Sequence, residues 1–332
     1  MAGETVRHSI AICTARGEKI LRVVLPRLAA AIADGPPTEV LLVNNDDVSA
    51  LGGLQDCLAC AFAGTSVQRI LLHEPTPGLS LARNAALEAA RGEILTFIDD
   101  DAAPRDRRWQ TTILRAFANK PDVGLVGGPV HLVPPPGQNP NPWWRGARTD
   151  GLLSAVSMNG PSAYCDPAGI PGVNASYRRS AIGSWRFDAR LGVNRTVALA
   201  LVGEETMLNW TLENAGWRAW FEQEATVDHH IGSERWNPRW LLRRARVAGR
   251  SVVATAHIRR LPVPWFGACK LMVTATLKAL VRTAQGKLDR AFSNACDIMA
   301  AYGHFEMLAH RRPQFMSEPL EVTGKPHAPG PP

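Results

Sequence analysis

The chain has 332 residues, 45% of them hydrophobic and 20% charged, a composition that excludes an intrinsically disordered chain and suffices for one large domain or two closely joined ones. The net charge of +7 is uneven, because residues 233–332 carry 16 Lys and Arg against 6 Asp and Glu while the remainder is slightly acidic. A basic last third predicts contact with an anionic partner, either a membrane surface or a nucleic acid.

The first 130 residues alternate between apolar strand-like runs and helix-like segments. Strands separated by helices in this way predict an α/β fold with a mostly parallel central sheet that is covered by helices on both faces. The expected strands span residues 9–13, 40–43, 67–73, 93–98 and 123–126, and the expected helices span 18–33, 51–63, 79–90 and 105–119.

Polar clusters follow three of these strands, at Thr14–Arg16, Asn44–Asp47 and Asp99–Asp101. In open α/β sheets, ligands bind beyond the carboxyl ends of the strands. We therefore expect these clusters to share one edge of the sheet and to form a binding site there.

The second half of the chain is less regular. A proline-rich loop at 134–144 predicts a subdomain boundary, and beyond it we expect strands at 173–179 and 217–227, a helix at 204–215 and mostly helical structure from 240 to 310. The predicted organisation is an α/β half at 1–133, a second half at 134–235, a basic helical region at 236–317 and a disordered tail at 318–332.

The chain start predicts no secretory signal, and the six cysteines are scattered, which favours reduced thiols in the cytosol. The most apolar late stretch, residues 262–281, is interrupted by Lys270 and Lys278. Since a membrane span needs about 20 mostly apolar residues, we expect no transmembrane helix.

Asp99, Asp100 and Asp101 are the strongest local signal for chemistry. Adjacent carboxylates repel one another, and a bound Mg²⁺ or Mn²⁺ relieves that repulsion. Alternate residues of an extended segment point the same way, so Asp99 and Asp101 could reach one cation together. Taken alone, the triplet could equally be a solvated acidic turn before the next helix.

The surrounding sequence adds to this signal, because residues 77–101 read PGLSLARNAALEAARGEILTFIDDD. The G-x-S-x-A-R-N element, the later A-x-G and the apolar strand that ends in acids resemble the inverting family 2 glycosyltransferases, which have the GT-A nucleotide-diphospho-sugar transferase fold. The resemblance implies that Asp99 and Asp101 bind a divalent metal ion, that Asp99 and Asp100 contact the nucleotide, and that Arg83 lies beside it.

Two further segments of the first half resemble this family. Thr14 and Arg16 follow the first strand, where the family's polar turn touches the nucleotide. Asn44 and Asp46 follow the second strand, where many members use an aspartate to bind the uracil edge. Asn44 stands at this position here, and an amide can also pair with a base edge.

The second half resembles the family's acceptor half up to Gly203-Glu204-Glu205, where the family has G-E-D and the last acid is the catalytic base. The resemblance implies that Glu205 is the base, with Glu204 as the alternative. It also implies that His229, or less well His230, completes the metal site. On their own, these groups could be helix-dipole acids and structural histidines.

Arginines at 235, 243, 244 and 246 resemble the family's arginine-rich helix and are candidates for contact with a diphosphate or an anionic acceptor, although most would then be ordinary solvated charges. Trp143, Trp144, Trp185 and Trp236 are candidates for stacking on sugar rings, although core packing is the alternative for them.

The layout most resembles bacterial exopolysaccharide glucosyltransferases of the succinoglycan type. It implies an enzyme that uses Mn²⁺ or Mg²⁺, a nucleotide-diphospho-sugar donor, UDP-linked in the first instance, and a saccharide or lipid-linked saccharide acceptor. We expect it to act in the cytoplasm, peripherally on the anionic inner face of the cytoplasmic membrane, with no nucleic-acid partner. The alternatives are a sugar nucleotidyltransferase and a non-catalytic sugar- or nucleic-acid-binding protein.

Overall fold

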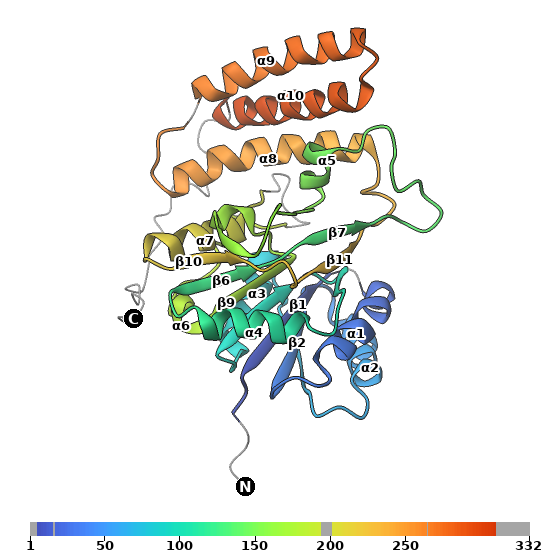
Figure 1. Ribbon diagram of the computed structural model, residues 1–332, viewed down its shortest axis with the longest axis vertical. Coiled ribbons are helices and arrows are strands. Elements are labelled where there is room, and N and C mark those ends of the chain that lie inside the picture. Colours follow the sequence, from blue (N-terminus) through green and yellow to red (C-terminus); the bar gives the residue numbers. More distant parts are fainter. Residues whose placement is uncertain (1–4, 16, 194–200, 264, 310–332) are drawn as a thin grey trace.

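The computed structural model describes residues 5–15, 17–193, 201–263 and 265–309. An eight-stranded sheet with the order β3-β2-β1-β4-β9-β6-β10-β8 forms the base of the molecule, and three long helices are stacked above it (Figure 1). The strands span β1 His8–Thr14, β2 Thr38–Asn44, β3 Gln68–His73, β4 Ile94–Ile98, β6 Val123–Gly127, β8 Ala163–Cys165, β9 Asn174–Arg178 and β10 Arg218–Phe221.

Parallel pairing joins β3, β2, β1 and β4, and also joins β6 to β10. The exceptions are β9, which is antiparallel to both β4 and β6, and the edge strand β8, which is antiparallel to β10. The sheet is therefore mostly parallel, as the sequence predicts, and β9 joins its two parallel parts.

Helices cover both faces of the sheet. Successive side chains of a strand point to opposite faces, so a strand with consecutive apolar residues needs a cover on each side. On β1, Ile10 and Ile12 join the apolar cluster beneath α1, α2 and α4, whereas Ala11 joins the cluster beneath α3 and α7. These helices span α1 Glu18–Ile32, α2 Leu51–Ala61, α3 Leu79–Ala89, α4 Trp109–Asn119 and α7 Glu204–Asn214.

The segment predicted as one strand over 217–227 forms two strands in two different sheets, because residues 222–226 turn between them. After this turn, β11 (Val227–His230) lies between β5 (Ala102–Pro104) and β7 (Val130–Val133) in a small second sheet. The start of the helix predicted at 105–119 is also corrected, since residues 105–108 form bends and turns and α4 begins at Trp109.

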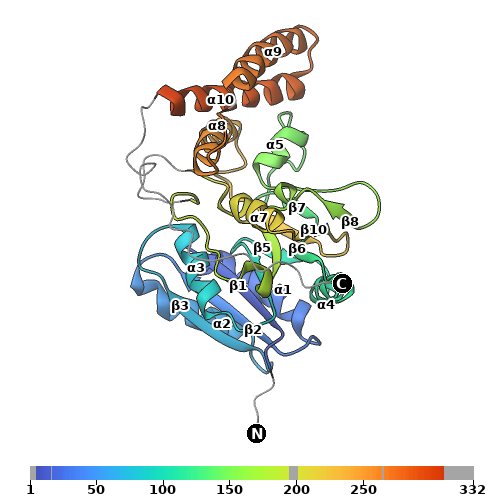
Figure 2. The ribbon, with the colours of Figure 1, turned by 90° about the vertical axis from the view of Figure 1, so that its left-hand side faces the viewer.

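The last third folds into the helical layer, which consists of α8 Pro238–Ile258, α9 Trp265–Ala284 and α10 Leu288–Ala309, with α10 between the other two (Figure 2). The short helix α5 (Ala147–Leu152) contacts both α8 and α10, while α6 (Arg179–Ile182) follows β9. None of the helices in the described ranges combines the length and hydropathy that a membrane span requires. The predicted disordered tail, 318–332, lies outside the described residues.

Two glycines allow α8 and α10 to approach closely. A Cβ at Gly249 would lie 1.8 Å from the carbonyl oxygen of Ala300, and a Cβ at Gly303 would lie 2.0 Å from that of Arg246. Backbone atoms cannot yield as flexible side chains do, so the helix contact depends on glycine at both positions.

We expect Gly249→Ala to lower the free energy of unfolding by about 1–3 kcal/mol, because the added methyl group overpacks the helix contact. Urea denaturation followed by circular dichroism would measure the change. The control is Gly52→Ala, in α2, where nothing lies within 4 Å of the added Cβ. This control should raise the stability by roughly 0.5–1 kcal/mol, and equal effects of both substitutions would contradict the packing argument.

Candidate active site

A cleft of about 360 Å³ opens at the carboxyl edge of the sheet, between the sheet and α8. The ends of β1 and β4, the starts of α3 and α7, and the first half of α8 all contribute to its wall. Its lining includes Thr14, Asp99, Asp100, Glu204 and Glu205. The two acidic segments, which are more than 100 residues apart in the sequence, therefore open into the same cleft.

The three adjacent aspartates each have different partners. The Asp100 carboxylate accepts a 2.7 Å hydrogen bond from the Thr14 hydroxyl, which ties the ends of β4 and β1 together. Asp101 accepts a 2.9 Å bond from Arg235. Asp99 is the most exposed of the three, with a third of its side chain accessible from the cleft, and it lies 3.4 Å from Arg83.

Asp99, Asp101 and His229 present ligand atoms within 4.8 Å of one another. His229 is 1% exposed, and neither of its ring nitrogens has a hydrogen-bond partner among the described residues. Its Nε2 atom is 3.1 Å from Oδ1 of Asp101, but the angle is not that of a hydrogen bond. A buried imidazole with unsatisfied nitrogens beside two carboxylates fits a divalent cation.

His230 points away from this group. The side chains of β11 alternate, so that His230 lies with Asp228 beside Arg27, with Nε2 of His230 3.2 Å and the Asp228 carboxylate 2.7 Å from the guanidinium. Of the two adjacent histidines, only His229 lies with the aspartates.

Arg83 connects the aspartates to the glutamates of α7. It is 3% exposed, its guanidinium donates a 2.6 Å hydrogen bond to Glu204, and it reaches Asp99 at 3.4 Å. Burial by itself would lower the pKa of Arg83. The carboxylates of Glu204 and Asp99 raise this pKa by more than burial lowers it, so the guanidinium stays charged.

The two glutamates at the start of α7 differ in environment. Glu204 is 4% exposed and is bound by Arg83, whereas the Glu205 side chain is 22% exposed in the cleft and 4.0 Å from Arg83. Burial raises the pKa of Glu205 to about 7, the Glu204 carboxylate adds to the rise, and Arg83 opposes it. A carboxyl group with this pKa can exchange protons near neutral pH.

The other residues predicted to bind a nucleotide are placed differently. Asn44 is buried, and its amide bonds to the backbone of residues 46 and 47 and to His73 rather than to the cleft. Asp46 is exposed and does not line the cleft, whereas the neighbouring Asn45 does. Arg16 lies outside the described residues.

Two residues of α8 line the cleft, of which the sequence analysis missed Trp240 and named Arg244 only within a group of arginines. Trp240 lines the cleft, with the Arg235 guanidinium 5.4 Å from its ring centroid. Arg244, which the sequence offered only as one of several arginines, also lines it and makes no hydrogen bond or ion pair with a described residue. Burial lowers its pKa, and the Glu205 and Glu204 carboxylates oppose that shift. Trp240 and Arg244 are four residues apart on one helix, and this spacing is the signal that would have grouped them.

The tryptophans proposed for sugar stacking are mostly elsewhere. Trp144 and Trp236 are buried and pack edge to face, with 5.1 Å between ring centroids. Trp185 packs against the core cluster beneath α3. Trp143 is exposed but contacts Phe292 of α10. None of the four lines the cleft.

We expect the protein to bind one Mn²⁺ per chain, and His229→Ala to weaken this binding by roughly 10–100-fold or more. The free Mn²⁺ signal in electron paramagnetic resonance, titrated with and without UDP, would measure the affinity. The control is His230→Ala, which changes the adjacent ring that faces Arg27 and should leave the affinity unchanged. A normal affinity in the His229 variant would remove this histidine from the site.

Comparison with known proteins agrees with this architecture. The chain is 25% identical over 266 residues to the succinoglycan biosynthesis protein ExoM of Rhizobium meliloti (strain 1021), covering 77% of this chain and 79% of the relative. A mannosyltransferase of Pyrobaculum calidifontis, solved with GDP-Man and Mn²⁺, superposes with a TM-score of 0.59 at 17% identity, over 90% of this chain and 87% of that one. GalNAc-T7, solved with UDP, GalNAc and Mn²⁺, superposes with a TM-score of 0.50 at 13% identity, over 79% of this chain and 52% of that one.

These superpositions confirm the predicted GT-A fold. The sequence itself matches the family described as Glycosyl transferase family 2 over residues 9–184, which is more than half of its length. This match includes the G-x-S-x-A-R-N element and all three aspartates of the cleft. The chain therefore belongs to glycosyl transferase family 2.

Proposed function

We propose that this glycosyltransferase moves a hexose, with inversion, from a UDP-linked donor to a hydroxyl of a saccharide or lipid-linked saccharide during bacterial exopolysaccharide synthesis. The observation that carries the proposal is a cleft that both acidic segments line. Asp99, which forms a group fit for a divalent cation with the buried Asp101 and His229, opens into this cleft, and so does the carboxyl group of Glu205. The likeness to a succinoglycan biosynthesis protein supports the exopolysaccharide assignment.

Glu205 is the proposed general base. Its carboxylate takes the proton of the acceptor hydroxyl, whose oxygen forms a bond to the anomeric carbon of the donor. The bond from that carbon to the diphosphate breaks on the opposite face, and the diphosphate leaves with the electron pair. A single displacement of this kind inverts the configuration. Glu205 suits this role better than Glu204, because Glu204 is buried and already bound to Arg83.

The remaining residues position the reactants and match their charge. Asp99, Asp101 and His229 would hold Mn²⁺ or Mg²⁺, which would stabilise the negative charge of the leaving diphosphate. Arg244 lines the cleft without an ion-pair partner among the described residues, so we assign it to an anionic part of the donor or acceptor. The flat indole of Trp240 offers a surface for a sugar ring.

The donor base is the least constrained part of the proposal. Asn44 is occupied within its own turn, so we assign Asn45 and Thr14, which line the cleft, as contacts of the nucleotide, together with Arg83, Asp99 and Asp100. A panel of UDP- and GDP-sugars, assayed with Mn²⁺ for release of the nucleoside diphosphate, tests the assignment. In a second assay, release of pyrophosphate from a nucleoside triphosphate and a sugar 1-phosphate would instead identify a nucleotidyltransferase. No turnover in either assay would favour a binding protein.

We place the enzyme on the inner face of the cytoplasmic membrane, where a lipid-linked acceptor would be found. Residues 233–332 supply the basic surplus that such a location needs, and each Lys or Arg close to an anionic leaflet contributes about 1 kcal/mol to binding. The carboxylates of Asp99, Asp100 and Glu205, which line the cleft, would repel a nucleic acid backbone instead.

We expect Glu205→Gln to lower kcat by about 10²–10⁴-fold, because the amide cannot accept the acceptor proton, while donor binding is retained. Initial rates of transfer, with donor affinity measured separately by calorimetry, would show the separation. The control is Glu234→Gln, which changes another glutamate of the cleft wall. We expect this variant to keep kcat, and an equal loss in both variants would argue against Glu205 as the base.

The pH dependence follows from the raised pKa of Glu205. The carboxylate is the active form, so kcat/KM should rise as the pH increases through about 7 and then level off. Glu205→Gln should leave a low activity without this rise. A wild-type profile that rises near the ordinary carboxyl pKa of 4.5 would contradict the assignment.

The same shift predicts an effect on stability. A carboxyl group whose pKa is raised by folding binds its proton more tightly in the folded chain than in the unfolded chain. The stability that this proton binding contributes is lost as the pH rises from 4.5 through about 7. Glu205→Gln should therefore be more stable than the wild type at pH above 7 and should lose this advantage in acid. Thermal unfolding at several pH values would test this without any assay of activity.

A further inference from the structure

Helix α9 carries an apolar stripe that no described residue covers. Only Ala268 and Ala275 of this helix are buried, on the side that packs against α10. Phe266, Val273, Leu277 and Leu280 are 73%, 59%, 59% and 65% exposed. The last three follow Phe266 by seven, eleven and fourteen residues, a spacing that puts all four on one helix face. The helix thus has two apolar faces, of which only one is packed.

The segment around this stripe carries positive charge and no acid. Residues 251–288 contain no Asp or Glu, and their basic side chains are Arg259, Arg260, Lys270, Lys278, Arg282 and Lys287. Of the three acids on α10, Asp297 binds Arg148 and Glu306 binds Arg246 and Arg250. Asp289, in the first turn, is exposed and is the one acid of this helix whose carboxylate pairs with no described residue. The outer side of the helical layer therefore presents exposed apolar groups among unmatched cations.

Aromatic rings stand at the beginning of the stripe. Trp265 is 50% exposed, and its ring centroid lies 4.0 Å from that of Phe266. Exposed Trp and Phe with Lys and Arg at the borders of an apolar face are typical of helices that lie in the boundary between lipid headgroups and acyl chains.

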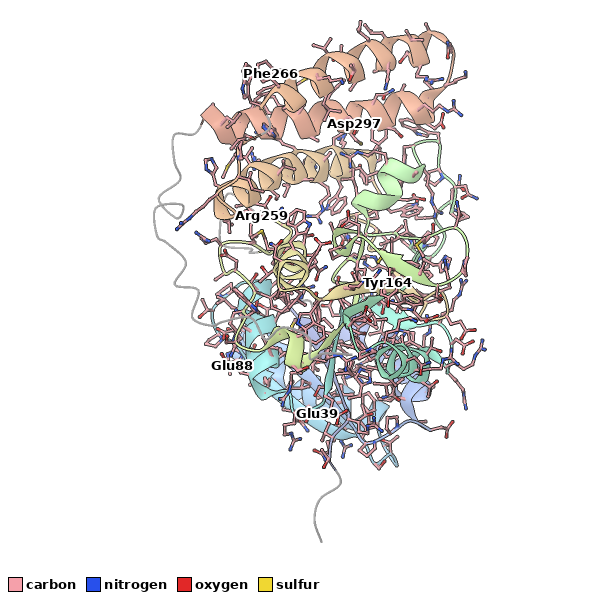
Figure 3. The ribbon with its side chains drawn as sticks, turned by 60° about the vertical axis from the view of Figure 1, so that its left-hand side comes forward. Glu39, Glu88, Tyr164, Arg259, Phe266 and Asp297 are labelled. Atoms are coloured by element: carbon pink, nitrogen blue, oxygen red, sulfur yellow. The ribbon has the colours of Figure 1, made fainter. Side chains whose placement is uncertain are left out.

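The position of α9 leaves the cleft free. In Figure 3, Phe266 is on the outermost helix, at the end of the molecule opposite the sheet. The cleft lies on the far side of α8, and α10 separates α8 from α9. A partner bound along α9 would thus not block the residues that line the cleft.

We propose that α9 lies flat on an anionic membrane, with the Phe266 stripe in the acyl boundary and Lys270 and Lys278 at the headgroups. The proposal deepens the membrane location proposed above by naming the surface that makes the contact. A second copy of the chain is a poorer occupant, because pairing two such faces would bring together like charges with no acid between them.

Flotation of the full-length protein with vesicles tests the proposal. Vesicles of phosphatidylcholine alone and of phosphatidylcholine with phosphatidylglycerol should differ, with binding to the anionic vesicles that weakens as salt increases. The triple variant F266S/L277S/L280S and the double variant K270E/K278E should each weaken binding to anionic vesicles by roughly tenfold or more. Equal binding of wild type to both kinds of vesicle would overturn the charge argument.

Matched controls separate this surface from general effects. Val48→Ser removes an apolar side chain that is 60% exposed on the sheet half, and K19E/R107E makes the same charge change on exposed residues of that half. Neither should weaken vesicle binding appreciably, and a loss as large as that of the α9 variants would overturn the proposal. Quenching of tryptophan fluorescence by brominated lipids should fall in Trp265→Phe, and unchanged quenching would place Trp265 outside the bilayer.

Two further readouts complete the test. Sedimentation should show a monomer for the wild type, and a dimer that the triple variant dissociates would assign the stripe to a second copy and overturn the proposal. Hydrolysis of the nucleotide-sugar donor in solution should be the same in wild type and α9 variants. A failure of vesicle binding with intact hydrolysis would reject the membrane surface alone, whereas a lack of hydrolysis in every protein would reject the proposed transfer reaction.

Discussion

The buried guanidinium of Arg83 holds the two acidic segments of the cleft in one place. It comes from α3 and reaches Asp99 at the end of β4 and Glu204 at the start of α7, which lie 16 and 121 residues farther along the chain. The rings of Phe97 and Phe187 are within 5.8 Å of it, and a Cβ at Gly172 would lie 2.5 Å from its Nη2 atom. Removal of one partner from a buried ion pair typically costs about 3–5 kcal/mol, so this position tolerates little change.

This arrangement leaves the cleft with an excess of negative charge. Six carboxylates, five that line the cleft at residues 99, 100, 204, 205 and 234 and that of the buried Asp101 beside Arg235, are accompanied by three arginines, 83, 235 and 244. Arg83 binds both acidic segments and Arg235 binds Asp101, while Arg244 stays without a direct partner among the described residues. Burial and, after it, the Glu204 carboxylate raise the pKa of Glu205, and the remaining negative charge matches the charge of a divalent cation between Asp99, Asp101 and His229. The closely spaced carboxylates that destabilise the cleft are thus the groups that the proposed reaction uses.

The sequence predicts the sheet edge well, because the information is local there. The strands β1, β2 and β4 end at Thr14, Asn44 and Ile98, and the polar residues at and after these ends lie at the carboxyl edge of the sheet, as parallel strands require. The antiparallel insertion of β9 between β4 and β6 could not be read in this way, since strand order depends on contacts between distant segments. The split of residues 217–227 was missed for the same reason, because β11 is fixed by β5 and β7.

Individual side chains in the site were harder to predict than the segments that carry them. The pattern at the end of β2 favours Asn44, yet the structure turns this amide inward to His73 and the loop backbone, and the next residue, Asn45, faces the cleft. A shift of one residue at a strand end moves a side chain to the opposite direction. For the histidines the choice of His229 over His230 rests on the register of β11 with β5, in which His229 pairs with Ala102.

The arginines of α8 show that one basic run can contain several separate functions. Arg244 lies four residues after Trp240, on the helix face that lines the cleft. Arg246 and Arg250, also four apart, both bind Glu306 of α10, next to the close contact at Gly249. Arg243 is exposed. Read as composition, these residues predict only a basic surface, whereas the helical period separates them by face. Arg243 remains exposed on α8, and the basic residues of the acid-free segment 251–288, which includes α9, are the ones that the proposed membrane contact would use.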